Sequence, residues 1–167
     1  MNEVGGVPTH YLLVHLVVVA VPAAALVAIA CALSPRVRRR WGTSALLMSV
    51  FAAISTYLAY ETGHSLELAL VGSEATQRHV AMGAALNAPT LVLALAVLGK
   101  VLFARLSERI KSEDDPRYRT ALRTAGVVAS AVTILAASTA VTTVYRIGNS
   151  GSNASWERVE NGNPDAP

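Results

Sequence analysis

The sequence predicts an all-α membrane protein: an antiparallel four-transmembrane-helix bundle with both termini extracytoplasmic. Four apolar runs of about 18 to 25 residues carry this prediction, because about 20 helical residues cross the ~30 Å hydrocarbon core of a bilayer. The composition agrees, with 53% hydrophobic residues, 15% charged residues and a mean hydropathy of +0.43. The charges lie almost wholly between the apolar runs, which leaves no separate soluble domain.

The predicted helices belong to one transmembrane domain, residues 1–148, and cover residues 11–34, 43–62, 79–111 and 119–146. We expect Pro35 to Gly42 to form a tight first connection, and Ser112 to Pro116 to end the third helix beyond the membrane. Short connections make neighbouring helices antiparallel. Residues 149–167 are rich in Gly, Asn and Ser, so we expect a polar and largely disordered C-terminal tail.

The basic residues predict the orientation of the bundle. Eleven of the fourteen lie between the first and second apolar runs or between the third and fourth, and these two stretches are therefore cytoplasmic by the positive-inside rule. They are Arg36, Arg38, Arg39, Arg40, Lys100, Arg105, Arg109, Lys111, Arg117, Arg119 and Arg123. The N-terminus and the C-terminus then both lie outside. Arginines beside anionic lipid headgroups also explain the pI near 9.4, so we expect the lipid bilayer and no nucleic acid as a partner.

All four histidines fall at the outer end in this topology: His10, His15, His64 and His79. Histidine near hydrocarbon is costly and is typically kept for ligation, proton handling or a buried hydrogen bond. His10 and His15 differ by about 140° around a helix axis, so a shared site must draw on different helices. A b-type haem held by His15 and His79 fits this layout, with His10 and His64 near the propionates or as alternate ligands.

Other interpretations of these residues stay open. Each histidine alone is typical of an interfacial hydrogen-bonding residue. The histidines could bind zinc or copper together with Glu61 or Glu74, but the sequence has no ligand spacing characteristic of such sites. Glu61 and His64 could act in acid-base catalysis, but nothing identifies a nucleophile or a substrate pocket. We therefore name no catalytic residue and expect a protein that is not an enzyme. The single cysteine, Cys31, excludes an internal disulfide and a Cys-rich metal centre.

Helix two also has a polar face, on which Tyr57, Glu61 and His64 recur at i, i+4 and i+7. Arg146 reaches the same level on the fourth helix, so Glu61 and Arg146 are a candidate ion pair near the outer interface. Pairing lowers the cost of placing each charge at this depth. The alternative is that both side chains extend separately to lipid headgroups.

Several segments together resemble the DUF2231 membrane-protein family over almost the whole chain. They are Pro8 to His15, Thr62 to His64, His79 with Gly83, and Val144 to Gly151 followed by Trp156. The resemblance implies a small four-helix protein of the bacterial plasma membrane, some of whose relatives occur with Rieske-type iron-sulfur domains. It favours a redox role with a Rieske-type or other redox membrane partner. Family members often have histidine where this chain has Asn149, which weakens that case.

Two functions from different classes therefore remain. The first is a haem b-binding electron-transfer or redox-partner subunit. The second is a non-catalytic structural, partner-binding or lipid-binding membrane protein. Transport is a weaker third interpretation, because four helices without repeats offer little room for alternating access.

Overall fold

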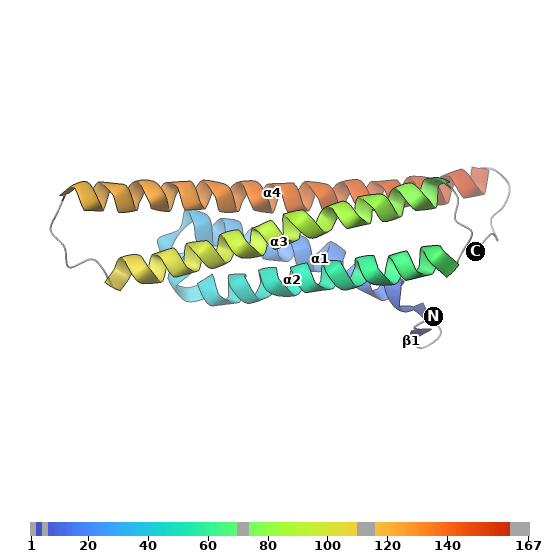
Figure 1. Ribbon diagram of the computed structural model, residues 1–167, viewed down its shortest axis with the longest axis horizontal. Coiled ribbons are helices and arrows are strands. Elements are labelled where there is room, and N and C mark those ends of the chain that lie inside the picture. Colours follow the sequence, from blue (N-terminus) through green and yellow to red (C-terminus); the bar gives the residue numbers. More distant parts are fainter. Residues whose placement is uncertain (1–2, 5–6, 70–73, 110–115, 161–167) are drawn as a thin grey trace.

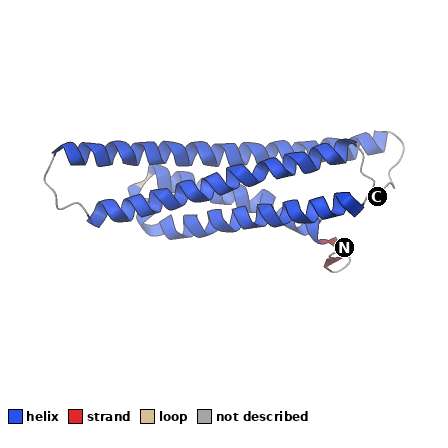
Figure 2. Ribbon diagram, in the orientation of Figure 1, coloured by secondary structure: helices blue, strands red, loops and turns tan. Residues whose placement is uncertain are grey.

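The computed structural model describes residues 3–4, 7–69, 74–109 and 116–160, and these form an elongated bundle of four long helices (Figures 1 and 2). The helices are α1 (Thr9–Leu33), α2 (Pro35–Ala69), α3 (Glu74–Arg109) and α4 (Pro116–Glu160). Two short strands, β1 (Glu3–Val4) and β2 (Val7–Pro8), pair antiparallel ahead of α1, with Glu3 opposite Pro8 and Val4 opposite Val7. The four long helices expected from the apolar runs are confirmed, and the short β1–β2 pair is an addition ahead of them.

The helices are arranged as a closed ring. Each packs against two neighbours, α1 on α2, α2 on α3, α3 on α4, and α4 back on α1. α1 begins and α4 ends at the same end of the bundle, which we call the termini end (Figure 1). The opposite end, where α1 passes into α2 and where α3 ends and α4 begins, is called the turn end. There α3 and α4 extend beyond the α1–α2 junction (Figure 1).

The α1–α2 junction is shorter than expected. α1 ends at Leu33 and α2 begins at Pro35, so Ser34 alone separates them and the expected connection Pro35 to Gly42 is helical. Proline is accommodated at the first helical position, where its missing N–H has no intrahelical partner. The Ser34 hydroxyl accepts a hydrogen bond from the Val37 backbone N–H (3.4 Å), which is the geometry of an N-cap.

The other helix bounds differ from the expected ones mainly because the helices continue beyond the apolar spans. α4 continues to Glu160, so residues 149–160, for which we expect a largely disordered tail, are helical, while 161–167 lie outside the described residues. An existing helix extends without a new nucleation cost, and the segment near Trp156 contains Ala, Glu and Arg, which have high helix propensity. α2 likewise passes residue 62 and ends at Ala69.

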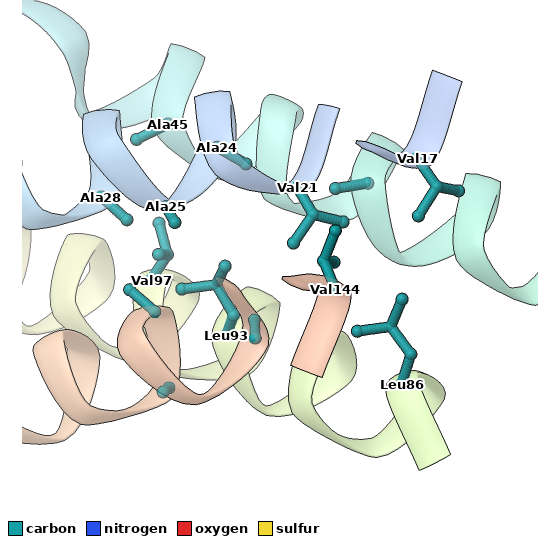
Figure 3. Close-up of a cluster of buried hydrophobic side chains, with 14 of the residues drawn as sticks. Val17, Val21, Ala24, Ala25, Ala28, Ala45, Leu86, Leu93, Val97 and Val144 are labelled. Atoms are coloured by element: carbon teal, nitrogen blue, oxygen red, sulfur yellow. The ribbon is translucent and has the colours of Figure 1, made fainter. Parts of the chain in front are cut away.

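The interior of the bundle is built mostly from small side chains. Leu93, Val21 and Val144 lie at its centre with alanines around them (Figure 3). Small residues let helix backbones approach closely, which is how helices associate inside a membrane. The buried alanines are Ala24, Ala25, Ala28, Ala32, Ala45, Ala52, Ala59, Ala94, Ala136, Ala137 and Ala140.

Large apolar side chains point outward instead. They include Leu26, Leu47, Phe51, Leu95, Val127 and Leu135. A soluble monomer rarely exposes so much contiguous apolar surface, whereas lipid tails cover it readily. Four helical segments are long and apolar enough to cross a membrane: Thr9–Leu33, Pro35–His64, Ala81–Ser107 and Arg117–Ser150.

Candidate functional site

His10 is inserted between two helices at the termini end. It lies in the first turn of α1, and its Nδ1–H donates a hydrogen bond to the backbone carbonyl of Ala59 on α2 (3.0 Å). Gly63, one turn further along α2, provides the space for the ring. A Cβ added at Gly63 would lie 2.7 Å from Cε1 of His10 and 3.0 Å from its Nδ1. Gly63 therefore forms a slot that lets His10 dock α1 onto α2.

His15 is held differently. Its side chain is exposed, and its Nδ1–H donates to the carbonyl of Tyr11 on the same helix (2.7 Å). Because a carbonyl only accepts, this bond fixes the neutral ring as the Nδ1–H tautomer and leaves a lone pair on Nε2. His15 thus lies on the outside of α1, while His10 contacts α2.

His64 is also exposed and stacks on Tyr60, one turn earlier in α2, with ring centroids 6.0 Å apart and an interplanar angle of 9°. His79 belongs to α3, and its side chain lies outside the described residues. The three described histidine rings are each held by a different neighbour. Across the described part of the chain, no three His, Cys, Asp or Glu side chains form a group suited to a metal ion.

The candidate ion pair involves two exposed side chains, Glu61 on α2 and Arg146 on α4. Glu61 forms a side-chain hydrogen bond with Tyr57, one turn earlier on its own helix. Tyr57 and Glu61 therefore contact each other along one face of α2. The bridge from Glu61 to Arg146 stays a prediction.

The turn end contains a polar network that the sequence analysis missed. Lys100 of α3 is buried, only 6% exposed, and its ammonium donates to the Gly126 carbonyl (2.6 Å) and the Ser130 hydroxyl (2.5 Å) of α4. Ser130 Oγ also lies within donating distance of the Ala32 carbonyl in the last turn of α1 (3.1 Å). Lys100 and Ser130 thereby join three helices.

Arg38 completes this network from α2. Its Nη1 donates to the Cys31 carbonyl (3.2 Å), so Cys31 and Ala32, in the last turn of α1, both have their carbonyls satisfied by side chains. The final carbonyls of a helix have no intrahelical donor and carry partial negative charge. On the neighbouring turn of α2, Thr43 accepts a hydrogen bond from Nη2 of Arg105 on α3 (3.1 Å).

One sequence signal could have identified Lys100 as an interior residue. We counted it with the basic residues of the third connection, yet Val101, Leu102 and Phe103 follow it and extend the apolar pattern of helix three. A lysine flanked on both sides by apolar helix is a candidate for burial with a polar partner.

Fold and side-chain distribution together define a four-helix integral membrane protein with a polar network at one end and dispersed histidines at the other. The family model for predicted membrane proteins DUF2231 matches residues 6–161, and the chain belongs to this family. The resemblance found in the sequence motifs is thereby confirmed. No curated protein and no solved structure matches the chain.

Proposed function

We propose that this protein is a non-catalytic membrane protein that acts by binding lipid or a partner subunit in the bilayer. The observation that carries the proposal is that each described histidine ring is bonded to, or stacked on, a different neighbour. His10 docks α1 onto α2, while His15 and His64 are exposed and bonded or stacked within their own helices. The expected haem site, with two histidine ligands from one bundle, requires two imidazoles that face a common space.

The packing supports the same conclusion. The α1–α2 interface at the termini end is filled by the His10 ring against Gly63, and the centre of the bundle is filled by Val, Leu and Ala side chains (Figure 3). A planar macrocycle between these helices requires them to separate. Such an expansion costs the close contacts of the small residues, which stabilise helix pairs in lipid.

The proposal includes an orientation in the bacterial plasma membrane. The turn end carries the arginines of early α2 together with Arg105, Arg117, Arg119 and Arg123. Positive charge is retained on the cytoplasmic side of a membrane. We therefore place the turn end in the cytoplasm and both termini outside.

A second candidate is a haem b-binding redox subunit in which a partner completes the site. His15 favours it, because histidine ligands commonly donate their other ring N–H to a carbonyl, as His15 does to Tyr11. The ring is exposed on α1, so the second ligand would come from a redox partner subunit, such as a Rieske-type protein, or from His79. His10 is committed to Ala59 and fits a ligand role less well.

Absorption spectra separate the two candidates. We would purify the full chain from haem-replete bacterial cells and record oxidised and dithionite-reduced spectra of wild type, His15→Ala and His64→Ala. The proposed function predicts no Soret band in any of them. A Soret band in wild type and His64→Ala that is lost in His15→Ala would establish the haem-binding alternative and assign its ligand.

A further inference from the structure

The turn end contains a buried positive charge whose described partners are neutral. The Lys100 ammonium is held by the Gly126 carbonyl and the Ser130 hydroxyl, and neither carries a formal charge. A buried ammonium is stabilised fully only when an opposite charge accompanies its hydrogen bonds. Two neutral acceptors also leave one of its three N–H donors available.

Arg38 adds a second positive charge beside the first. It lies close enough to Lys100 for the two charges to repel each other. Its side-chain stem lies near Gly42, where an added Cβ would be 3.6 Å from Cγ of Arg38. Nη1 is occupied by the Cys31 carbonyl, but Nε is buried and has no hydrogen-bond partner among the described residues. An unpaired buried donor of a charged group is costly, and a missing acceptor explains it best.

The C-terminus of α1 compensates only part of this charge. A helix C-terminus is equivalent to roughly half a negative charge, whereas Arg38 and Lys100 carry two positive charges. Glu61 is the only carboxylate among the side chains that the structure describes, and it lies toward the termini end. The described residues of the turn end therefore form a site with excess positive charge and unused N–H donors.

We propose that Arg38 and Lys100 bind the phosphate of an anionic phospholipid headgroup at the turn end. A guanidinium offers parallel N–H donors that match phosphate oxygens, and basic pockets between transmembrane helices on the cytoplasmic side are typical headgroup sites. Leu33, at the end of α1, and Trp41, one turn after Arg38, are both exposed. Their apolar surfaces suit acyl chains and the membrane interface, which favours a lipid over free phosphate.

This inference deepens the proposed function by naming the lipid chemistry. It is tested by native mass spectrometry of the full-length protein in neutral detergent, titrated with dioleoylphosphatidylglycerol or dioleoylphosphatidylcholine. We compare wild type with Arg38→Lys, which keeps the charge but removes Nε and the fork, and with Lys100→Gln. Arg40→Gln is the matched control, because Arg40 is an exposed arginine of the same helix start.

We expect saturable phosphatidylglycerol binding by wild type, about tenfold weaker binding by Arg38→Lys and by Lys100→Gln, and a change below about twofold in Arg40→Gln. Phosphatidylcholine should bind more weakly than phosphatidylglycerol. Unchanged thermal unfolding of Arg38→Lys ensures that its lost binding reports on the site and not on folding.

Three outcomes would overturn the inference. Equal losses in Lys100→Gln and Arg40→Gln, with wild-type binding retained in Arg38→Lys, would indicate general charge attraction. Saturation by inorganic phosphate without preference for phosphatidylglycerol would indicate a free-anion site. Absence of saturable phosphatidylglycerol binding would show that the positive charge of this cluster is already compensated within the protein. A colourless protein that fails to bind the lipid would contradict this inference alone, whereas stoichiometric haem would contradict the proposed function.

Discussion

Replacing Gly63 with alanine should destabilise the protein when His10 is present and stabilise it when His10 is absent. The new methyl group would lie 2.7 Å from Cε1 of His10, closer than ordinary contacts allow, so the ring must move. Overpacking costs about 1–3 kcal/mol, and loss of the His10 to Ala59 hydrogen bond costs about 1 kcal/mol. Against this, alanine is favoured over glycine in a helix by about 1 kcal/mol. The net expectation is destabilisation by about 1–3 kcal/mol.

Without the His10 imidazole, Gly63→Ala causes no clash, and only the higher helix propensity of alanine affects the stability of the protein. Gly63→Ala in a His10→Ala background should therefore stabilise the protein by about 1 kcal/mol, giving a coupling free energy of about 2–4 kcal/mol between the two sites. The assay is a double-mutant cycle of reversible unfolding in mixed micelles with increasing sodium dodecyl sulfate. If Gly63→Ala stabilises both backgrounds equally, with coupling below about 0.5 kcal/mol, the docking of His10 in the Gly63 slot is refuted.

Two further predictions use the same unfolding measurement. Ser130→Ala removes the hydroxyl that accepts from Lys100 and should cost about 1.5–3 kcal/mol, whereas exposed Ser138→Ala on the same helix should change stability by less than about 0.5 kcal/mol. Equal effects of the two serine variants would count against the Lys100 network. His10→Ala should cost about 1 kcal/mol and His15→Ala less than about 0.5 kcal/mol. A larger loss in His15→Ala than in His10→Ala would indicate that a ligand is bound through His15, since ligand binding adds to apparent stability.

The transmembrane helices could be predicted because their signal is local. An uncharged run of about 20 apolar residues has few other stable structures, so the composition of each run was sufficient. The start of α2 was predicted less well, although Ser34 followed by Pro35 is itself a local signal for an N-cap and a first helical position. Arginines there were interpreted as a loop because of their charge, yet arginine is a good helix former.

The contacts that define the two ends depend on residues far apart in the sequence. His10 contacts Ala59 and Gly63 only because α1 and α2 pack with a particular rotation. A histidine at the start of an apolar run does not specify that partner. Lys100 similarly contacts Ser130 of α4, and Ser130 in turn contacts the Ala32 carbonyl near the end of α1. Periodicity places a residue on a helix face, but the pairing of faces is decided by tertiary packing.

The central claim is that the histidines support helix packing and the outer surface and bind no cofactor within one bundle. The haem content of the purified protein tests this claim most directly. We would determine haem per chain by the pyridine haemochromogen assay on wild type expressed in haem-replete bacterial cells. The account predicts haem far below one per chain. One haem per chain would contradict it and would make this four-helix protein a b-type cytochrome.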